Sequence, residues 1–173
     1  MRNERGFVLI ELVIATAIMA LVAGAAGMAT FRIITDTERS NNHMTAVRQV
    51  QNTGNWISRD AMMAQDIDTD DDPGTTDVEF VTFDWSDWEN GDTHKVIYTF
   101  YDMGDGLKRL KRQQVIRDTD NVEIGNMVTL VAEYIVDSSS FSEQNGVWKL
   151  SIEARSGDEV ESRDYKIIPR VNT

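Results

Sequence analysis

An uncharged, largely apolar run near the start of the chain constrains this protein more than any other feature. Residues 12–31 hold no charged side chain, and residues 7–31 hold one, Glu11. At about 1.5 Å per residue, twenty helical residues span roughly 30 Å, the thickness of the hydrocarbon core of a bilayer. The sequence therefore predicts a membrane-spanning helix at residues 7–31, with the remaining chain folded on one side of it.

The residues before the run indicate its orientation. Arg2 and Arg5 are the basic residues there, so the positive-inside rule places the N-terminus in the cytoplasm and the rest of the chain across the membrane. A cleaved secretory signal peptide has the same order of basic start and apolar run, and residues 23–25 (Ala-Gly-Ala) would be a weak cleavage site for one. The run is longer than an ordinary signal core, however, and a signal peptide has no use for the carboxylate of Glu11.

The charge of Glu11 inside an apolar helix requires an explanation. A carboxylate in the membrane interior costs about 2.5–3.5 kcal/mol by insertion scales, and such residues are functional by default. No Lys, Arg or His lies within residues 7–31. Its partner therefore has to come from another chain or from a newly made group.

Residues 5–12, Arg-Gly-Phe-Val-Leu-Ile-Glu-Leu, resemble the processing and methylation site of bacterial type IV prepilins and of the pseudoprepilins of type II secretion. The resemblance implies that residues 1–6 are a leader peptide, that prepilin peptidase cuts after Gly6, and that the new amine of Phe7 is methylated. The mature chain would have 173 − 6 = 167 residues. The implied partners are other pilins or pseudopilins in a filament or tip complex, the prepilin peptidase, the inner-membrane assembly platform, and the lipid bilayer before assembly.

Cleavage after Gly6 would give Glu11 its partner. The cationic amine of Phe7 would stand four residues away, about one helical turn on the same face. In a filament the same carboxylate could meet the amine of an adjacent subunit, and in apolar surroundings that pairing would favour one axial register over others. The residues allow either pairing, and the resemblance implies the one between subunits. Many major pilins carry a proline in this helix, so its absence from residues 7–31 indicates a minor subunit.

The sequence stays compatible with helix beyond the apolar run. Residues 32–65 are expected to form the amphipathic half of the same long helix, with a break or bend at residues 40–42 (Ser-Asn-Asn). Apolar and small side chains at spacings of three and four form one stripe: Val47, Val50, Gly54, Ile57, Ala61 and Ala64. We expect this stripe to pack on a sheet and Asp60 to lie off it. The alternative is a membrane tether followed by an unrelated helix.

Residues 66–173 are predicted to form a β-rich globular head. Strand-like runs occupy residues 78–83, 95–101, 107–116, 128–136, 147–154 and 160–168, and residues 138–146 are expected to form a polar loop. Because no helical stretch separates these strands, they should pair in an antiparallel sheet. The predicted fold class is α+β and pilin-like, a long N-terminal helix packed on that sheet. Together with residues 56–60 (Trp-Ile-Ser-Arg-Asp) near the end of the predicted helix, this head resembles that of J-type pseudopilins or W-type minor pilins.

The negative charge is concentrated where the predicted helix ends. The chain has a net charge of −12, and the acidic loop at residues 66–92 holds eleven Asp and Glu and no Lys or Arg. Asp66, Asp68 and Asp70 alternate like the start of a calcium loop, although the EF-hand template then fails at Asp71, where it needs Gly. Several pseudopilins use calcium in place of disulfides, and this chain has no cysteine. The alternative is a solvated acidic loop.

Two further features allow contact functions. Trp85 and Trp88, among acidic residues, either mark a docking or carbohydrate surface or pack over an edge of the sheet. The basic run at residues 108–112 (Lys-Arg-Leu-Lys-Arg) either faces acidic partners at a subunit interface or consists of solvated strand residues. The net charge of −12 makes nucleic acid a poor partner.

Catalysis has little support in the sequence. There is no cysteine, and neither His43 nor His94 neighbours a recognisable nucleophile motif or phosphate-binding loop. We therefore expect a structural subunit and no enzyme: a minor pilin or pseudopilin of a type IV pilus or type II secretion pseudopilus, held in the bacterial inner membrane before assembly. The alternative is a membrane-anchored binding module with an acidic, Trp-containing, calcium-binding surface.

Overall fold

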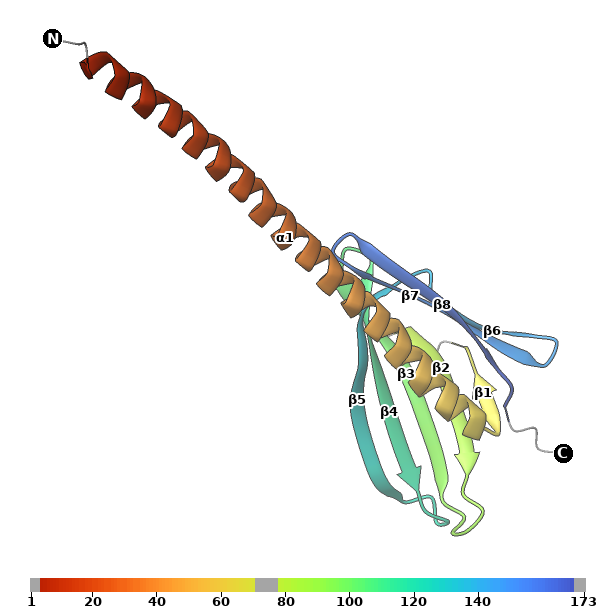
Figure 1. Ribbon diagram of the computed structural model, residues 1–173. Helices are drawn as coiled ribbons and strands as arrows, with labels where there is room; N and C mark the ends of the chain where they lie inside the picture. The colour runs from red at the N-terminus through yellow and green to blue at the C-terminus, as the bar shows by residue number, and fades with distance from the viewer. Residues whose placement is uncertain (1–3, 71–77, 170–173) are drawn as a thin grey trace. The chain divides into compact units, whose positions relative to one another are not determined.

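The computed structural model describes residues 4–70 and 78–169, and the side chains of residues 4–8 lie outside that description. One helix precedes the strands (Figure 1). The elements are α1 Glu4–Met63, β1 Asp66–Asp68, β2 Val78–Ser86, β3 Thr93–Gly104, β4 Leu107–Arg117, β5 Glu123–Val136, β6 Ser140–Gln144, β7 Val147–Ser156 and β8 Glu159–Ile167. The chain divides between Asn41 and Asn42 into two compact units, which are described separately.

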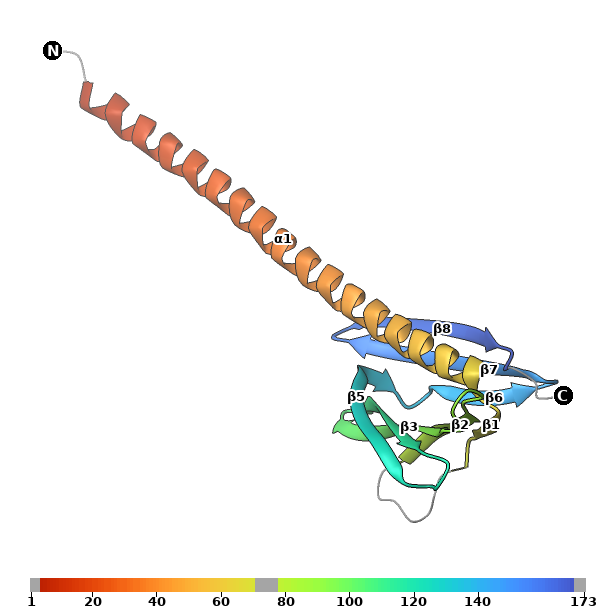
Figure 2. The ribbon, with the colours of Figure 1, turned by 90° about the horizontal axis from the view of Figure 1, so that it is seen from below.

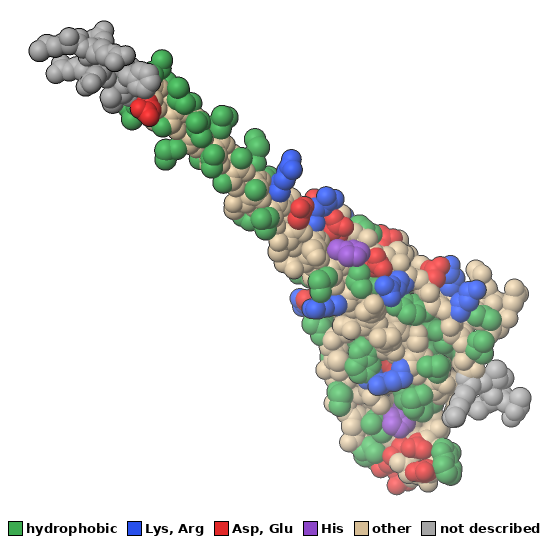
Figure 3. Space-filling view, in the orientation of Figure 1, with side chains coloured by type: hydrophobic (Ala, Val, Ile, Leu, Met, Phe, Trp, Pro, Cys, Tyr) green, Lys and Arg blue, Asp and Glu red, His purple; other side chains and the backbone are tan. Residues whose placement is uncertain are grey.

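The N-terminal unit is helical and exposed. Every described side chain from Leu9 to Asn41 is exposed, and an 18-residue window in this part of α1 has a mean hydropathy of 2.3. Hydrophobic side chains cover its visible face (Figure 3). The hydroxyls of Thr16 and Thr30 donate to the carbonyls of Val13 and Ala26, at 2.9 and 3.0 Å, so these polar groups are satisfied within the helix. By length and composition this helix fits a transmembrane anchor.

A break at residues 40–42 is wrong, because α1 is helical through all three, while a bend there remains a prediction. Asn and Ser lower helix propensity by only about 0.5–0.7 kcal/mol each relative to Ala, too little to end a helix that packing supports. Asn42 also has a partner in the head, since its Oδ1 lies 3.4 Å from the hydroxyl of Ser156. The domain limits at residues 6, 31 and 65 remain predictions.

The C-terminal part of α1 buries one face. Its buried side chains recur at helical spacing: Ala46, Val50, Thr53, Gly54, Ile57, Asp60 and Ala61, followed by Ala64 just beyond the helix. Five of the six predicted stripe positions are buried, and Val47 is half-buried. The prediction that Asp60 lies off the stripe is wrong, because its side chain is 1% exposed. The stripe packs against the sheet, as expected.

All eight strands join one antiparallel sheet in the order β1-β2-β3-β4-β5-β7-β6, with β8 added beside β7. The connection between β5 and β7 is narrow, a single register pair of Ile135 with Ala154. Figures 1 and 2 show the sheet as two wings, β1–β5 and β6–β8, with the C-terminal part of α1 lying along both. The predicted α+β, pilin-like layout is confirmed.

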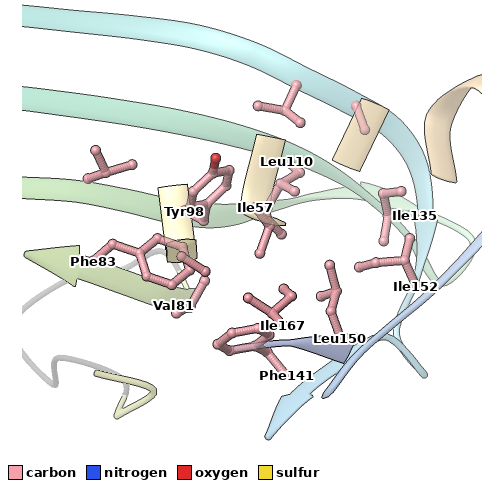
Figure 4. Packing of buried hydrophobic residues seen from close by; sticks show 14 of the residues in the cluster. Ile57, Val81, Phe83, Tyr98, Leu110, Ile135, Phe141, Leu150, Ile152 and Ile167 are labelled. Atoms are coloured by element: carbon pink, nitrogen blue, oxygen red, sulfur yellow. The ribbon is translucent and has the colours of Figure 1, made fainter. Parts of the chain in front are cut away.

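The core fills the space between the helix and the two wings. Figure 4 shows Ile57 of α1, Tyr98 and Leu110 of the first wing, and Leu150 and Ile152 of the second pointing toward one another. Each of these five side chains is fully buried. This shared core is what fixes the helix on the sheet, because its apolar surface would otherwise face water.

The prediction of a loop at residues 138–146 is wrong in part. Ser140–Gln144 forms β6, which pairs with the first half of β7. The reason is Phe141, whose ring meets Phe83 edge-on at 5.9 Å and stacks on Trp148 at 4.9 Å. The flanking Ser, Glu and Gln side chains hid this strand, since tertiary packing of one aromatic residue outweighs weak local strand propensity.

Candidate functional site

The predicted processing site lies at the start of α1. The backbone of Gly6 and Phe7 is helical, while the Phe7 side chain and residues 1–3 of the predicted leader fall outside the described part. Glu11 is exposed and lies four residues after Phe7 on the same continuous helix. The roles of these three residues in processing and assembly remain predictions.

Glu11 is surrounded by apolar surface. Ile10 and Leu12 on either side of it are exposed, and the next charged residue along the helix is Arg32. Arg32 lies twenty-one positions after Glu11, a rise of about 32 Å on a helix, so the two cannot pair. The arrangement can therefore do one thing chemically: it presents a carboxyl group to a cation supplied by an N-terminal amine or by another molecule.

The three predicted calcium ligands lie on and after β1. Asp66 and Asp68 are exposed residues of that strand, and Oδ1 of Asp68 accepts a hydrogen bond from the backbone N–H of Asp70 at 2.9 Å. No group of three possible ligand side chains is assembled among the described residues. Asp71 falls outside them, as do the other acidic residues of 71–77. Calcium binding at this loop remains a prediction.

Asp84 of β2 lies opposite Asp66 in the register between β1 and β2. Partial burial raises the pKa of the Asp84 carboxyl, the charge of Lys95 lowers it, and the charges of Asp66 and Asp68 raise it further. The net shift is upward. The junction between helix and sheet is therefore a place where negative charge is crowded and only partly compensated.

The basic run on β4 is engaged within the head. Arg109 forms an ion pair with Glu133 at 2.8 Å, and Lys108 pairs with Asp137 at 2.7 Å. The ammonium of Lys111 lies 4.1 Å from the centre of the Tyr101 ring. These contacts explain the run without an external partner. Neither sequence interpretation, an interface patch or solvated strand residues, describes it well.

Asp60 is the site residue that the sequence interpretation missed. Its carboxylate accepts hydrogen bonds from Nε of Arg112 at 2.6 Å and from the hydroxyl of Tyr98 at 2.6 Å. Burial first, and then the Asp60 charge, raise the pKa of Tyr98, so the phenol stays a donor. The signal was available, since Asp60 follows Ile57 by three residues and precedes Ala64 by four, which places it on the buried stripe.

A groove of about 740 Å³ lies beside this buried cluster. Trp85 and His94 stack in its wall, with ring centres 5.1 Å apart and planes 3° from parallel. Gln114 holds the His94 ring through Nδ1 at 3.2 Å. Trp88 also lines the groove, and its side chain is 88% exposed. Trp85 thus packs against the sheet, as one interpretation expected, whereas Trp88 is available for contact.

Comparison with known proteins adds one finding. A family model described as the prokaryotic N-terminal methylation motif matches residues 1–27. No curated protein and no solved structure matches the chain. The matched range contains Gly6, Phe7 and Glu11 and ends inside the exposed apolar part of α1. This motif is the prepilin-type signal, which indicates processing by prepilin peptidase.

Proposed function

We propose that this chain, a type IV pilin-like or pseudopilin precursor by its N-terminal motif, is a minor structural subunit of a type IV pilus or a type II secretion pseudopilus. The observation that carries the proposal is the continuity of the motif with an exposed apolar helix. Residues 1–27 match the motif, and the same helix continues without a break into the part that packs on the head. Proteins with this motif are structural subunits.

The proposed course of events follows from the properties of α1. The N-terminus stays in the cytoplasm, the apolar stretch spans the inner membrane, and the head folds on the far side. Prepilin peptidase removes residues 1–6 after Gly6 and methylates Phe7. The inner-membrane assembly platform then transfers the subunit into a filament or tip complex. Apolar helix surface that faced lipid becomes contact surface between the helices of neighbouring subunits.

Glu11 has a specific role in this proposal. Its carboxylate pairs with the Phe7 amine of an adjacent subunit. In apolar surroundings an unpaired charge is costly, so a subunit seated out of register would leave both charges unpaired. The pair therefore selects one axial position without adding much net stability to the filament.

The N-terminus of the protein extracted from membranes tests the proposal directly. Mass spectrometry should find a mature chain of 167 residues, which is 173 − 6, beginning at methylated Phe7. The variant Gly6→Val should accumulate uncut, and Gly24→Ala, whose added methyl group meets no atom within 4 Å, should be processed normally. An intact Met1, or a chain cut after residues 23–25, would contradict the proposal.

The inference that this chain is a minor, low-abundance subunit rests on the composition of its helix. No proline lies within residues 7–31, and Gly24 and Gly27, the two glycines there, are the residues that weaken the helix most. A helix of this kind should resist the partial melting that proline allows in abundant subunits. Quantitative mass spectrometry of purified filaments should find this chain at a small fraction of the most abundant pilin, and equal amounts would contradict the minor rank.

The groove favours a second candidate function, a membrane-anchored binding module. The observation is Trp88, an indole that is 88% exposed and lines a groove together with Arg59 and His94. If the groove binds a ligand, Trp88→Ala should abolish binding of that ligand and leave both processing and filament incorporation intact. Loss of incorporation in Trp88→Ala would instead place Trp88 in a contact between subunits.

A further inference from the structure

Strand β5 has one free edge. Its other edge is paired with β4 along the whole strand, from Glu123 opposite Arg117 to Val136 opposite Leu107. On the free side, the described strands supply one partner residue, Ala154 opposite Ile135. Near that end the backbone N–H of Glu133 donates to Oε1 of Gln49 at 3.0 Å, so α1 occupies the edge there.

The free part of β5 is apolar as well as unpaired. Ile124, Met127, Val128 and Leu130 of β5 are each between 52% and 62% exposed, and Val122, in the turn just before the strand, is 57% exposed. Met127 and Val128 are adjacent in a strand, so exposed apolar side chains project on both faces of the sheet. We call residues 123–130 the β5 edge. An edge of this length, about 26 Å at 3.3 Å per residue, offers backbone groups and side-chain contacts together.

Three other edge strands of the sheet, β8, β1 and β6, are protected in ways that the β5 edge is not. Strand β8 has five charged residues among its nine: Glu159, Glu161, Arg163, Asp164 and Lys166. Strands β1 and β6 have only three and five residues. Short strands and charged side chains are the usual means by which proteins block unwanted pairing at sheet edges. The β5 edge combines length with apolar side chains, which is the character of an edge that receives a partner.

The charge around the β5 edge indicates what kind of partner fits. Residues 118–133 contain four acidic residues and no Lys or Arg, and Arg117 on β4 lies opposite Glu123, so the net charge at this end of the edge stays negative. Three of the acids, Asp118, Asp120 and Glu123, lie at the start of the strand and its preceding turn, while Glu133 is paired with Arg109. A second copy of this chain would bring acidic residues near acidic residues, on top of a net charge of −12. A strand with basic ends would meet complementary charge.

We propose that the β5 edge binds, by strand addition, an extended segment of a different protein subunit that has an apolar centre and a basic residue near Asp118–Glu123. Backbone hydrogen bonds would supply the affinity, and alternate side chains of the added strand would pack on Met127 or on Val128. This interaction goes beyond the proposed function, because it joins heads and does not involve α1 or the processing site.

A titration of the full chain in detergent micelles tests the proposal. The ligand is the synthetic peptide Lys-Thr-Val-Thr-Val-Thr-Val-Lys. Calorimetry should detect binding, and hydrogen–deuterium exchange should slow at the amides of the β5 edge. Val128→Lys should weaken binding by about tenfold or more, since it places a cation where the added strand packs. Val128→Thr, which keeps strand propensity, should weaken it less. Val160→Lys changes another half-exposed valine, 50% exposed against 61% for Val128, on charged β8 and should not alter binding.

Peptide controls separate strand addition from simple adhesion. A peptide N-methylated at two adjacent central residues loses one central N–H donor on each edge and carries a methyl group where the neighbouring strand must lie, so it should bind much more weakly. A peptide with Glu at both ends should bind much more weakly. The proposal is overturned if these peptides bind as well as the first, if Val128→Lys binds normally, or if none binds at millimolar concentration. Self-association of the chain that protects the β5 edge would overturn the choice of a different subunit. Processing at Gly6 is measured separately, so failure here leaves the proposed function standing.

Discussion

The carboxylate of Asp60 and the guanidinium of Arg112 join the end of α1 to the middle of β4 through two hydrogen bonds, 2.6 Å to Nε and 3.2 Å to Nη2. The two side chains are 1% and 3% exposed. The hydroxyl of Tyr98 donates to the same carboxylate, and the Trp56 ring lies 5.2 Å from the guanidinium carbon. With its charge matched and its hydrogen bonds satisfied, this buried pair fixes the rotation and height of the helix on the sheet.

Removing one member of this pair should destabilise the head strongly. Asp60→Leu leaves the Arg112 charge buried without its counterion, which costs about 3–5 kcal/mol. Arg112→Met should cost a similar amount, and the double variant should recover most of the loss, since neither charge then remains. Denaturant unfolding in detergent, followed by tryptophan fluorescence, measures all three. Arg109→Met, at a partly exposed pair, is the control and should cost less than about 1 kcal/mol. If the double variant lost as much free energy of unfolding as the two single variants together, the coupling between Asp60 and Arg112 would be contradicted.

Gly54 lies where α1 has no room for a side chain. A methyl group there would overlap the ring of Tyr165, which packs across the helix and whose hydroxyl lies 3.3 Å from the Val50 carbonyl. Ala normally gains about 1 kcal/mol over Gly in a helix. Here Gly54→Ala should instead lower the free energy of unfolding by about 1–3 kcal/mol, because overpacking outweighs propensity.

A double-mutant cycle checks the cause of that loss. In a Tyr165→Ala background, Gly54→Ala should become neutral or stabilising, since the obstructing ring is gone. Gly24→Ala in the exposed part of the same helix should not lower stability at all. A loss at Gly54 that persists without the Tyr165 ring would contradict the packing explanation.

The fold was predictable wherever side-chain periodicity is strong. The stripe containing Val50 and Ile57 follows from helical spacing, and Leu150 and Ile152 follow from alternation in β7. Strand β6 was not predictable, because its burial depends on one residue, Phe141, meeting rings from β2 and β7. Local sequence carries no sign of partners that are distant along the chain.

The candidate sites also differ in whether they can be predicted from the sequence. The residues predicted to act in processing and assembly, Gly6, Phe7 and Glu11, stand out in the sequence because a leader, an offset carboxylate and an apolar run form one local pattern, which the matched motif contains. The pair of Asp60 with Arg112 and the open edge of β5 depend on register between segments, which a charge count does not encode. The charge of Asp60 suggests a position outside the core, although its spacing from Ile57 and Ala64 places it on the buried stripe.

The partly buried carboxyl of Asp84, which lies near Asp66 and Asp68, makes a prediction about pH. Its raised pKa means that the folded state binds this proton more readily than the unfolded state, whose carboxyl titrates near 3.8. The ionised carboxyl therefore costs stability at neutral pH, and the cost disappears as pH falls below the unfolded value. Asp84→Asn should raise stability at pH 7 and have no such effect near pH 3. Denaturant unfolding at both pH values measures this, and exposed Asp158→Asn serves as control. A benefit of Asp84→Asn that is independent of pH would contradict the explanation.

The carboxylate of Glu11 should act after processing and not during it. Because cleavage after Gly6 precedes any pairing with the new amine, Glu11→Ala should yield the same methylated Phe7 terminus as the unaltered chain. Incorporation into the filament should fall severely, since nothing then selects the axial register. Glu11→Gln, matched in shape but uncharged, should behave like Glu11→Ala, whereas Glu11→Asp should keep part of the function. Mass spectrometry of the N-terminus and copurification with partner pilins measure the two steps separately. Normal copurification of the Glu11→Gln variant would show that charge at this position does not set the register.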